Sequence, residues 1–209
     1  KKYKIESKFI NFSSCEIYGN YKKKISVETI KKPISPYGVA KLKAHNLTKY
    51  YRDNYNLKSY NAIIFNTESY FRPKYYLVPK ICLAAIKAKE KNIKTEFGNL
   101  NISREWNWCD EQCKYLIIFV NKKPQDFILS NGKSYSAINL MKFAFGYFNL
   151  DYKKYISVNK IFIRKKDSKI KKSNYLKCLY RNNIKRNDKF FGKKLIYSLI
   201  KHYLHEEKY

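Results

Sequence analysis

Apolar residues along the chain fall into short runs that alternate with longer periodic segments. The short runs are typical of buried strands and lie at residues 8–12, 60–65 and 127–130. Apolar residues that recur every three to four positions predict amphipathic helices. Five such segments are residues 37–55, 78–91, 110–121, 137–148 and 193–205. Strands that alternate with helices indicate an α/β protein with a parallel sheet.

The segments between these elements carry loop and turn signals. Residues 21–36 are basic, and Pro33 and Pro36 disfavour a regular element there. Residues 70–76 also read as a loop, and residues 98–108 as a loop or a short strand. The chain is therefore expected to connect its strands and helices through several irregular segments.

The helix predicted at residues 37–55 carries one clear apolar stripe. Ala40, Ala44, Leu47 and Tyr51 follow helical spacing, so they share one face. We expect this face to pack on the sheet or on a partner helix.

Composition indicates a folded protein with one core or a domain and a half. The chain has 209 residues, of which 44% are hydrophobic, which argues against disorder. We find no apolar run long enough to span a bilayer and no signal-peptide core after the lysine-rich start. Five cysteines without a regular framework predict reduced thiols in a cytoplasmic protein.

The formal net charge of +29 raises the question of nucleic-acid binding. Lysines are scattered through every segment, and the only runs are at residues 22–24, 164–166 and 169–172. Such runs are usually solvated. We therefore interpret the charge as a compositional feature that also favours an anionic substrate, and we do not expect nucleic acid as the partner.

The most informative stretch follows the first predicted strand. Two hydroxyls and a carboxylate come at its end, in Ser13, Ser14 and Glu16, and a later helix opens with Tyr37 and carries Lys41 one turn on. Side chains four apart share a helix face, and a nearby cation lowers the pKa of a tyrosine. Tyr37 is therefore a candidate general base, with Ser14 to hold a substrate hydroxyl. By itself, a Tyr and a Lys four positions apart on a helix surface are more often a packed and a solvated residue without a catalytic role.

The combination of these motifs is more specific than either alone. The run Ser-Ser-Cys-Glu-Ile-Tyr-Gly at residues 13–19 resembles the Ser-Thr-Ser-Glu-Leu-Tyr-Gly run of the GDP-mannose 4,6-dehydratases. These enzymes belong to the extended short-chain dehydrogenase/reductase family. Their Ser-Pro-Tyr-x-x-x-Lys motif is similar to residues 35–41.

The resemblance implies the C-terminal part of a Rossmann-like, doubly wound parallel sheet with a smaller mixed α/β substrate-binding domain. It divides the chain into residues 1–67, the remaining part of the NADP-binding domain, and residues 68–209, mainly the sugar-nucleotide-binding region. A strand and helix near residues 95–125 are expected to return to the sheet. The six glycines form no phosphate-binding loop, so we expect the first half of the cofactor domain to be absent and the fragment alone to be inactive.

The resemblance also implies a reaction and a role for each residue. The activity is that of an NADP-dependent hydro-lyase of GDP-fucose biosynthesis, which converts GDP-mannose to GDP-4-keto-6-deoxymannose. It oxidises position 4, eliminates water across positions 5 and 6, and returns the hydride to position 6. Tyr37 is then the base for the 4-hydroxyl, Lys41 tunes it and holds the nicotinamide ribose, Ser14 orients the hydroxyl, and Glu16 removes the proton from position 5. The alternative for Glu16 is a solvated loop carboxylate.

Further positions match substrate or cofactor residues of the family. Residues 66–69 are similar to the family's Asn-His-Glu-Ser, and Ser-Arg-Glu-Trp at residues 103–106 is similar to Leu-Arg-Asp-Trp. The residues that the resemblance assigns to substrate are Asn66, Lys80, Arg104, Arg164 and Asp167, and the one that it adds for the cofactor is Arg72. For each Arg or Lys the alternative is a solvated surface charge.

The departures from the family pattern include Thr67, Phe71 and Ile138, where the family has a histidine and two arginines. Two other functions therefore stay open. One is another sugar-nucleotide dehydratase or epimerase, which Glu16 and residues 66–69 disfavour. The other is a basic binding protein that keeps the fold without the activity.

The resemblance implies a homo-oligomer, a dimer or tetramer, assembled through the helix that holds Tyr37 together with the helix that precedes it in the family. We expect no metal site, because the thiols of Cys109 and Cys113 lack further ligands nearby in the sequence. The three histidines are expected to be isolated, and they are His45, His202 and His205.

Overall fold

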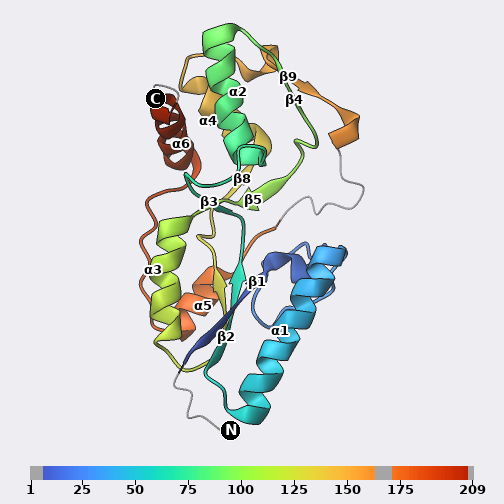
Figure 1. The fold of residues 1–209 in the computed structure, drawn as a ribbon, viewed down its shortest axis with the longest axis vertical. Coiled ribbons are helices and arrows are strands. Elements are labelled where there is room, and N and C mark those ends of the chain that lie inside the picture. The colour runs from blue at the N-terminus through green and yellow to red at the C-terminus, as the bar shows by residue number, and fades with distance from the viewer. Residues whose placement is uncertain (1–6, 163–170, 207–209) are drawn as a thin grey trace.

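A computed structural model describes residues 7–162 and 171–206, which form two lobes stacked along the long axis (Figure 1). The sheet lobe consists of β1 (Phe9–Ser14), η1 (Cys15–Tyr18), α1 (Pro36–Tyr55), β2 (Ser59–Ile64), α3 (Cys109–Val120), β7 (Asp126–Leu129) and α5 (Tyr175–Arg181). The helix lobe consists of α2 (Leu77–Lys91), β4 (Thr95–Phe97), α4 (Ala137–Gly146), η2 (Tyr152–Lys154), β9 (Ile156–Val158), η3 (Lys160–Phe162) and α6 (Gly192–Glu206). Four short strands near the junction are β3 (Thr67–Glu68), β5 (Ser103–Glu105), β6 (Asn107–Trp108) and β8 (Ser134–Ser136).

The sheet lobe is built on a parallel three-stranded sheet in the order β1-β2-β7. The first and last residues of β1, Phe9 and Ser14, pair with Ser59 and Ile64 of β2. Among the described residues β1 pairs only with β2, so its other edge is open. Since parallel strands end at the same edge, the polar residues that follow β1 and β2 lie at one end of the sheet.

Helices cover both faces of this sheet. Figure 1 shows α1 on one side and α3 with α5 on the other. On the α3 and α5 side, Tyr60 and Ala62 of β2 pack with Phe119 and Phe127. This arrangement is doubly wound and confirms the predicted α/β class.

The helix lobe has its own core. Helices α2, α4 and α6 pack against one another through buried apolar residues that include Ile81, Ala85, Met141, Leu195 and Leu199. Strand β4 pairs in parallel with β9, and the junction strands form a parallel pair, β3–β6, and an antiparallel pair, β5–β8. The second lobe is thus a mixed α/β unit.

The segment near residues 95–125 divides between the lobes. Helix α3 packs against β7 of the sheet lobe, whereas β4 pairs with β9 in the helix lobe. The strand that joins the parallel sheet is β7, which follows this segment. The division at residue 67 stays a prediction.

The apolar stripe on α1, expected to pack on the sheet or on a partner helix, does not face the sheet. Ala40, Ala44, Leu47 and Tyr51 are exposed on α1, and α1 instead turns His45 and Thr48 inward. The reason is the polar surface that the sheet presents there. Asn61 of β2 donates to the His45 carbonyl oxygen at 3.0 Å, so a polar helix face is the one that fits.

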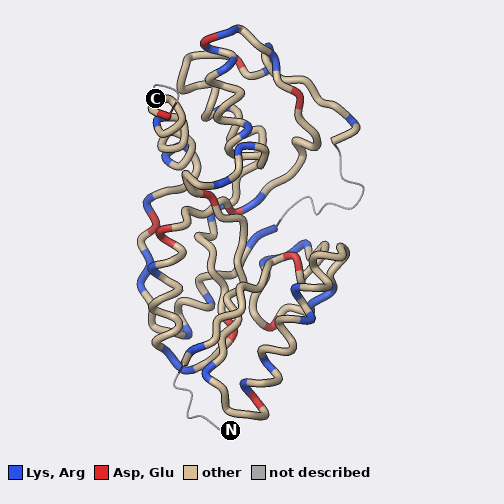
Figure 2. Tube along the Cα trace, in the orientation of Figure 1, with Lys and Arg blue, Asp and Glu red and all other residues tan. Residues whose placement is uncertain are grey.

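Lysine and arginine are spread over both lobes (Figure 2). No described helix has the length and apolar character needed to cross a bilayer.

Candidate active site

The turn after β1 places Glu16 at the carboxyl end of the sheet. Ser14 caps this turn, because its Oγ accepts a hydrogen bond from the Glu16 backbone N–H at 3.2 Å. The turn ends at Gly19, whose φ is +56°. A Cβ there would lie 2.1 Å from the Lys32 carbonyl oxygen, so only glycine fits. The Glu16 side chain keeps a third of its surface exposed.

Helix α1 begins beside this turn. Ser35 caps it by accepting a hydrogen bond from the Gly38 N–H at 3.0 Å, and Pro36 takes the first helical position. Tyr37 follows with 56% of its surface exposed. A Cβ on Gly38 would lie 2.8 Å from the Glu16 carbonyl oxygen. The first turn of α1 therefore packs directly against the backbone that carries Glu16.

Lys41 links α1 to the end of β1. Its Nζ donates to the Phe12 carbonyl oxygen at 2.7 Å and lies 5.8 Å from the centre of the Tyr37 ring. The structure thus brings the segments of Ser14, Glu16, Tyr37 and Lys41 to one end of the sheet. Their chemical roles stay predictions.

A further side chain reaches this turn from the distant end of the chain. The Nζ of Lys171 lies 3.2 Å from Glu16 Oε2, and the Lys171 side chain is fully buried. The run at residues 169–172 was expected to be solvated, and for Lys171 this expectation is wrong. Lys171 and Ser173 are buried while Lys172 between them is exposed, an alternation typical of an extended segment.

Cys15 belongs to the core beneath the turn. It packs with Ile17, Ile63 and Ile128, and burial raises the pKa of its thiol to about 12, against the opposing charge of Lys171. Cys15 is therefore protonated near neutral pH and contributes to packing.

The residues assigned to substrate lie at several places. Asn66 follows β2 at the same end of the sheet, and its carbonyl oxygen accepts hydrogen bonds from the backbone N–H and the side chain of Asn107 at 2.9 and 2.8 Å. Arg104 is buried in β5. Lys80 lies in the helix lobe, with its Nζ 4.9 Å from the Phe97 ring centre. Arg164 and Asp167 fall outside the described residues.

Thr67, Phe71 and Ile138, which depart from the family pattern, differ in their surroundings. Thr67 bonds through its hydroxyl to the Phe65 carbonyl oxygen at 3.1 Å. Phe71 is 94% exposed, and Ile138 is half-buried in the first turn of α4. Only Thr67 is thus held by a local hydrogen bond.

Glu68, next to Thr67, is a buried carboxyl that pairs with Arg72. It is 1% exposed, and Arg72 Nε lies 3.5 Å from its Oε2. The Arg72 guanidinium also stacks on the Tyr76 ring at 4.0 Å. Burial raises the pKa of Glu68 from 4.5 to about 7, because the attraction of Arg72 offsets only part of the desolvation.

This shift predicts a pH-dependent stability. The folded protein binds a proton at Glu68 more tightly than the unfolded chain does. The stability that this proton contributes is therefore fully present below pH 4.5 and is lost as the pH rises through the folded-state pKa of about 7. The stability of Glu68→Gln relative to the wild type should therefore increase by about 3 kcal/mol between pH 4.5 and pH 8. Urea unfolding at both pH values measures this change, with Glu90→Gln on the exposed face of α2 as the control. A stability difference between Glu68→Gln and the wild type that does not vary with pH would contradict this prediction.

His45 was expected to be isolated, and this is wrong. Its Nδ1 lies 3.1 Å from Ser13 Oγ and its Nε2 3.2 Å from Asp126 Oδ2. Arg52 and Asn61 donate to the other Asp126 oxygen at 2.8 and 2.9 Å. Burial alone would raise the pKa of Asp126, but these partners together hold it below its ordinary range. Ser13 and His45 are almost fully buried, so this Ser-His-Asp row joins α1 to the sheet and offers no accessible nucleophile.

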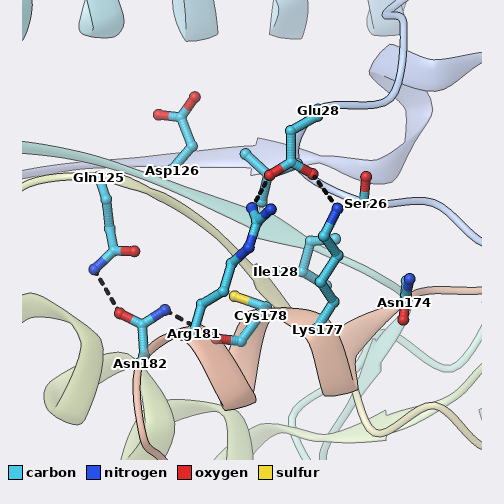
Figure 3. A pocket seen from close by; sticks show the side chains of 11 residues that line it. Ser26, Glu28, Gln125, Asp126, Ile128, Asn174, Lys177, Cys178, Arg181 and Asn182 are labelled. Carbon is cyan, nitrogen blue, oxygen red and sulfur yellow. Dashed lines mark hydrogen bonds and ion pairs between the residues drawn. The ribbon is translucent and has the colours of Figure 1, made fainter.

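A cavity of about 180 Å³ lies between the loop at residues 26–28, the start of β7 and α5 (Figure 3). Glu28 pairs there with Arg181 and, at 3.5 Å, with Lys177. Gln125 donates to Asn182 Oδ1 at 2.8 Å. None of the described residues predicted for catalysis or binding lines this cavity. Its charges are already paired, so the candidate site is the end of the sheet near Glu16 and Tyr37.

Comparison of the sequence with known proteins identifies a family. The sequence profile described as GDP-mannose 4,6 dehydratase matches residues 1–188. The chain is 29% identical over 159 residues to GDP-mannose 4,6 dehydratase 1 of Arabidopsis thaliana, which covers 75% of this chain and 44% of that protein. It is 30% identical over 141 residues to the human GDP-mannose 4,6 dehydratase, covering 66% of this chain and 38% of that protein. The chain therefore spans less than half the length of these relatives.

Solved structures agree on the fold. The dTDP-glucose 4,6-dehydratase of Bacillus anthracis, in complex with NAD, superposes with a TM-score of 0.84 at 16% identity, over 97% of this chain and 63% of that one. The protein RMD of Pseudomonas aeruginosa, complexed with NADPH, gives 0.84 at 15% identity, over 97% and 68%. These likenesses concern the fold alone, and the match over residues 1–188 gives the assignment: the chain belongs to the GDP-mannose 4,6-dehydratase family.

Proposed function

We propose that this chain supplies the catalytic and sugar-binding part of an NADP-dependent GDP-mannose 4,6-dehydratase. Its product would be GDP-4-keto-6-deoxymannose, and the reaction would be an early step of GDP-fucose biosynthesis. The observation that carries the proposal is the contact between Gly38 and the Glu16 backbone, because it sets a phenol and a carboxylate at the same end of β1. The dehydratase family and its relatives in plants and animals support GDP-mannose as the substrate.

The residues divide the proton transfers between them. Tyr37, exposed at the start of α1, accepts the proton of the 4-hydroxyl while Ser14 orients that hydroxyl. The Lys41 ammonium lies beside this base, 5.8 Å from the centre of the Tyr37 ring. Glu16 takes the proton from position 5, which a ketone at position 4 acidifies. Tyr37 and Glu16 thus take up two protons. One of them is needed for the hydroxyl at position 6 to leave as water, and the other returns to position 5 when the hydride returns to position 6, so the steps balance.

The exposed Tyr37 and the half-buried Lys41 fit a nicotinamide cofactor, since the hydroxyl and ammonium can both reach a ribose. The bound cofactor would supply the temporary hydride acceptor. Structural relatives described with NAD or NADPH support a nicotinamide group. We favour NADP. Arg72 contacts Glu68 and Tyr76 in the structure. Its role in binding the cofactor is part of this proposal.

A homo-oligomer is also part of the proposal. Helix α1 exposes Leu47, Tyr50, Tyr51 and Tyr55, an apolar face that a second copy of the helix would cover. A dimer or tetramer that pairs this helix would explain why its apolar stripe faces away from the sheet.

Product analysis tests the activity directly. The protein as its gene encodes it, given GDP-mannose and NADP, should form a ketone with a methyl group at position 6 and release one water per sugar. NMR of the nucleotide sugar identifies the product. An isomer of unchanged mass would indicate an epimerase, and binding of both ligands without any product would indicate the non-catalytic alternative. Dehydration of another nucleotide sugar in preference to GDP-mannose would contradict the proposed substrate.

A further inference from the structure

Lys171 is a buried cation whose ammonium contacts the turn that carries Glu16. Its Nζ donates to the Cys15 carbonyl oxygen at 3.3 Å and to the Gly19 carbonyl oxygen at 3.1 Å. The same Nζ forms an ion pair with Glu16, 3.2 Å from its Oε2. The two carbonyl groups flank the turn, and the carboxylate between them is the one proposed to act as a base.

The backbone of Lys171 is itself fixed on both sides. Its N–H donates to the Ser103 carbonyl oxygen at 3.2 Å, and Ile25 donates to the Lys172 carbonyl oxygen at 2.8 Å. Two residues later, the backbone N–H and the hydroxyl of Ser173 both donate to the buried Glu105 carboxylate at 2.6 Å. The backbone of Lys171 is therefore held by β5 and the basic loop, independently of Glu16.

The exposure of the pair is asymmetric. The Lys171 side chain is 0% exposed, whereas the Glu16 side chain keeps 33%. One carboxylate oxygen faces the buried cation, and the exposed part of the group is left for a substrate. A buried lysine is costly unless it is paired and hydrogen-bonded, so a lysine at this place needs Glu16 and the two carbonyls as partners.

We propose that Lys171 is a positioning residue for Glu16, holding its carboxylate at the end of β1 in the orientation that removes the proton from position 5 of the sugar. The inference rests on the proposed function, because that role of Glu16 belongs to it. Lys171 does not touch the sugar. Without it, Glu16 would rotate into solvent, and misplacement of a base by about 1 Å costs roughly 100-fold in rate.

The kinetic test separates the two half-reactions in the protein as its gene encodes it. Lys171→Met should lower the rate of water elimination by about 100-fold, while oxidation at position 4, followed by absorbance of the reduced cofactor, stays within about threefold of wild type. Lys172→Met is the matched control, since it removes the exposed neighbouring ammonium, and both rates should stay within about twofold. Equal elimination rates in Lys171→Met and Lys172→Met would overturn the inference.

A spectroscopic test on residues 1–209 does not depend on activity or on how Lys171→Met folds. In a ¹H–¹⁵N spectrum of lysine ammonium groups, Lys171 should exchange slowly with water, and Glu16→Gln should shift its signal while leaving that of Lys172 unchanged. A Lys171 signal insensitive to Glu16→Gln would contradict the contact. If Glu16→Gln leaves the elimination rate unchanged, the proposed function is wrong. If Glu16→Gln stops elimination but Lys171→Met leaves its rate unchanged, only the positioning role of Lys171 is wrong.

Discussion

Tyr37→Phe is expected to lower turnover of GDP-mannose by about 1,000-fold, within the range for removing a general base. The variant keeps the ring that packs near Lys41 and loses only the hydroxyl that accepts the proton from position 4. Oxidation at position 4 is the first step, so the reduced cofactor should not accumulate. Stopped-flow absorbance of the cofactor and the steady-state rate measure both effects.

Tyr50→Phe is the matched control for this variant. Tyr50 lies on the same helix, is half exposed and is far along α1 from the proposed site. Its hydroxyl should contribute nothing to the rate. A Tyr37→Phe protein that forms the reduced cofactor as fast as Tyr50→Phe would exclude Tyr37 as the base.

Glu16→Gln is expected to stop the reaction at a later point. The amide keeps the size of the side chain and can still bond Lys171, but it cannot take a proton from carbon. We expect the product to form about 1,000-fold more slowly, while oxidation at position 4 continues and the reduced cofactor accumulates. Exchange of the hydrogen at position 5 with solvent deuterium should be lost together with elimination.

Glu96→Gln provides the comparison for Glu16→Gln. Glu96 is an exposed carboxylate on β4 in the helix lobe, so the overall charge changes equally. Its rates should match those of the wild type. Solvent exchange at position 5 that survives in Glu16→Gln would assign the proton transfer to another group.

Much of the fold could be predicted from the sequence, because the local signals and the packing agree. The apolar run of β2 is buried on both faces, as expected for a strand in the middle of a parallel sheet. The start of α1 follows from Ser35 and Pro36, a capping residue and a proline in the positions that helices favour. The motif spacing also placed Glu16 and Tyr37 on consecutive elements, and parallel topology then brings them together.

Other features depend on contacts that no local pattern encodes. The inward face of α1 is polar because Asn61 and Asp126 lie opposite it on the sheet, so hydrophobic periodicity pointed to the outer face. Lys171 reaches Glu16 from a segment that is distant in the sequence and lies in a basic run. Only the folded chain reveals that this lysine is buried.

Tyr37 and Glu16 are proposed to act on one hexose ring, and a crystal structure of the protein as its gene encodes it, with GDP-mannose and NADP bound, would show whether they do. We expect the Tyr37 hydroxyl to lie within about 3 Å of the 4-hydroxyl, and the Glu16 carboxylate to face position 5 with Lys171 behind it. A hexose bound elsewhere, or a Glu16 side chain turned away from the ring, would exclude this mechanism.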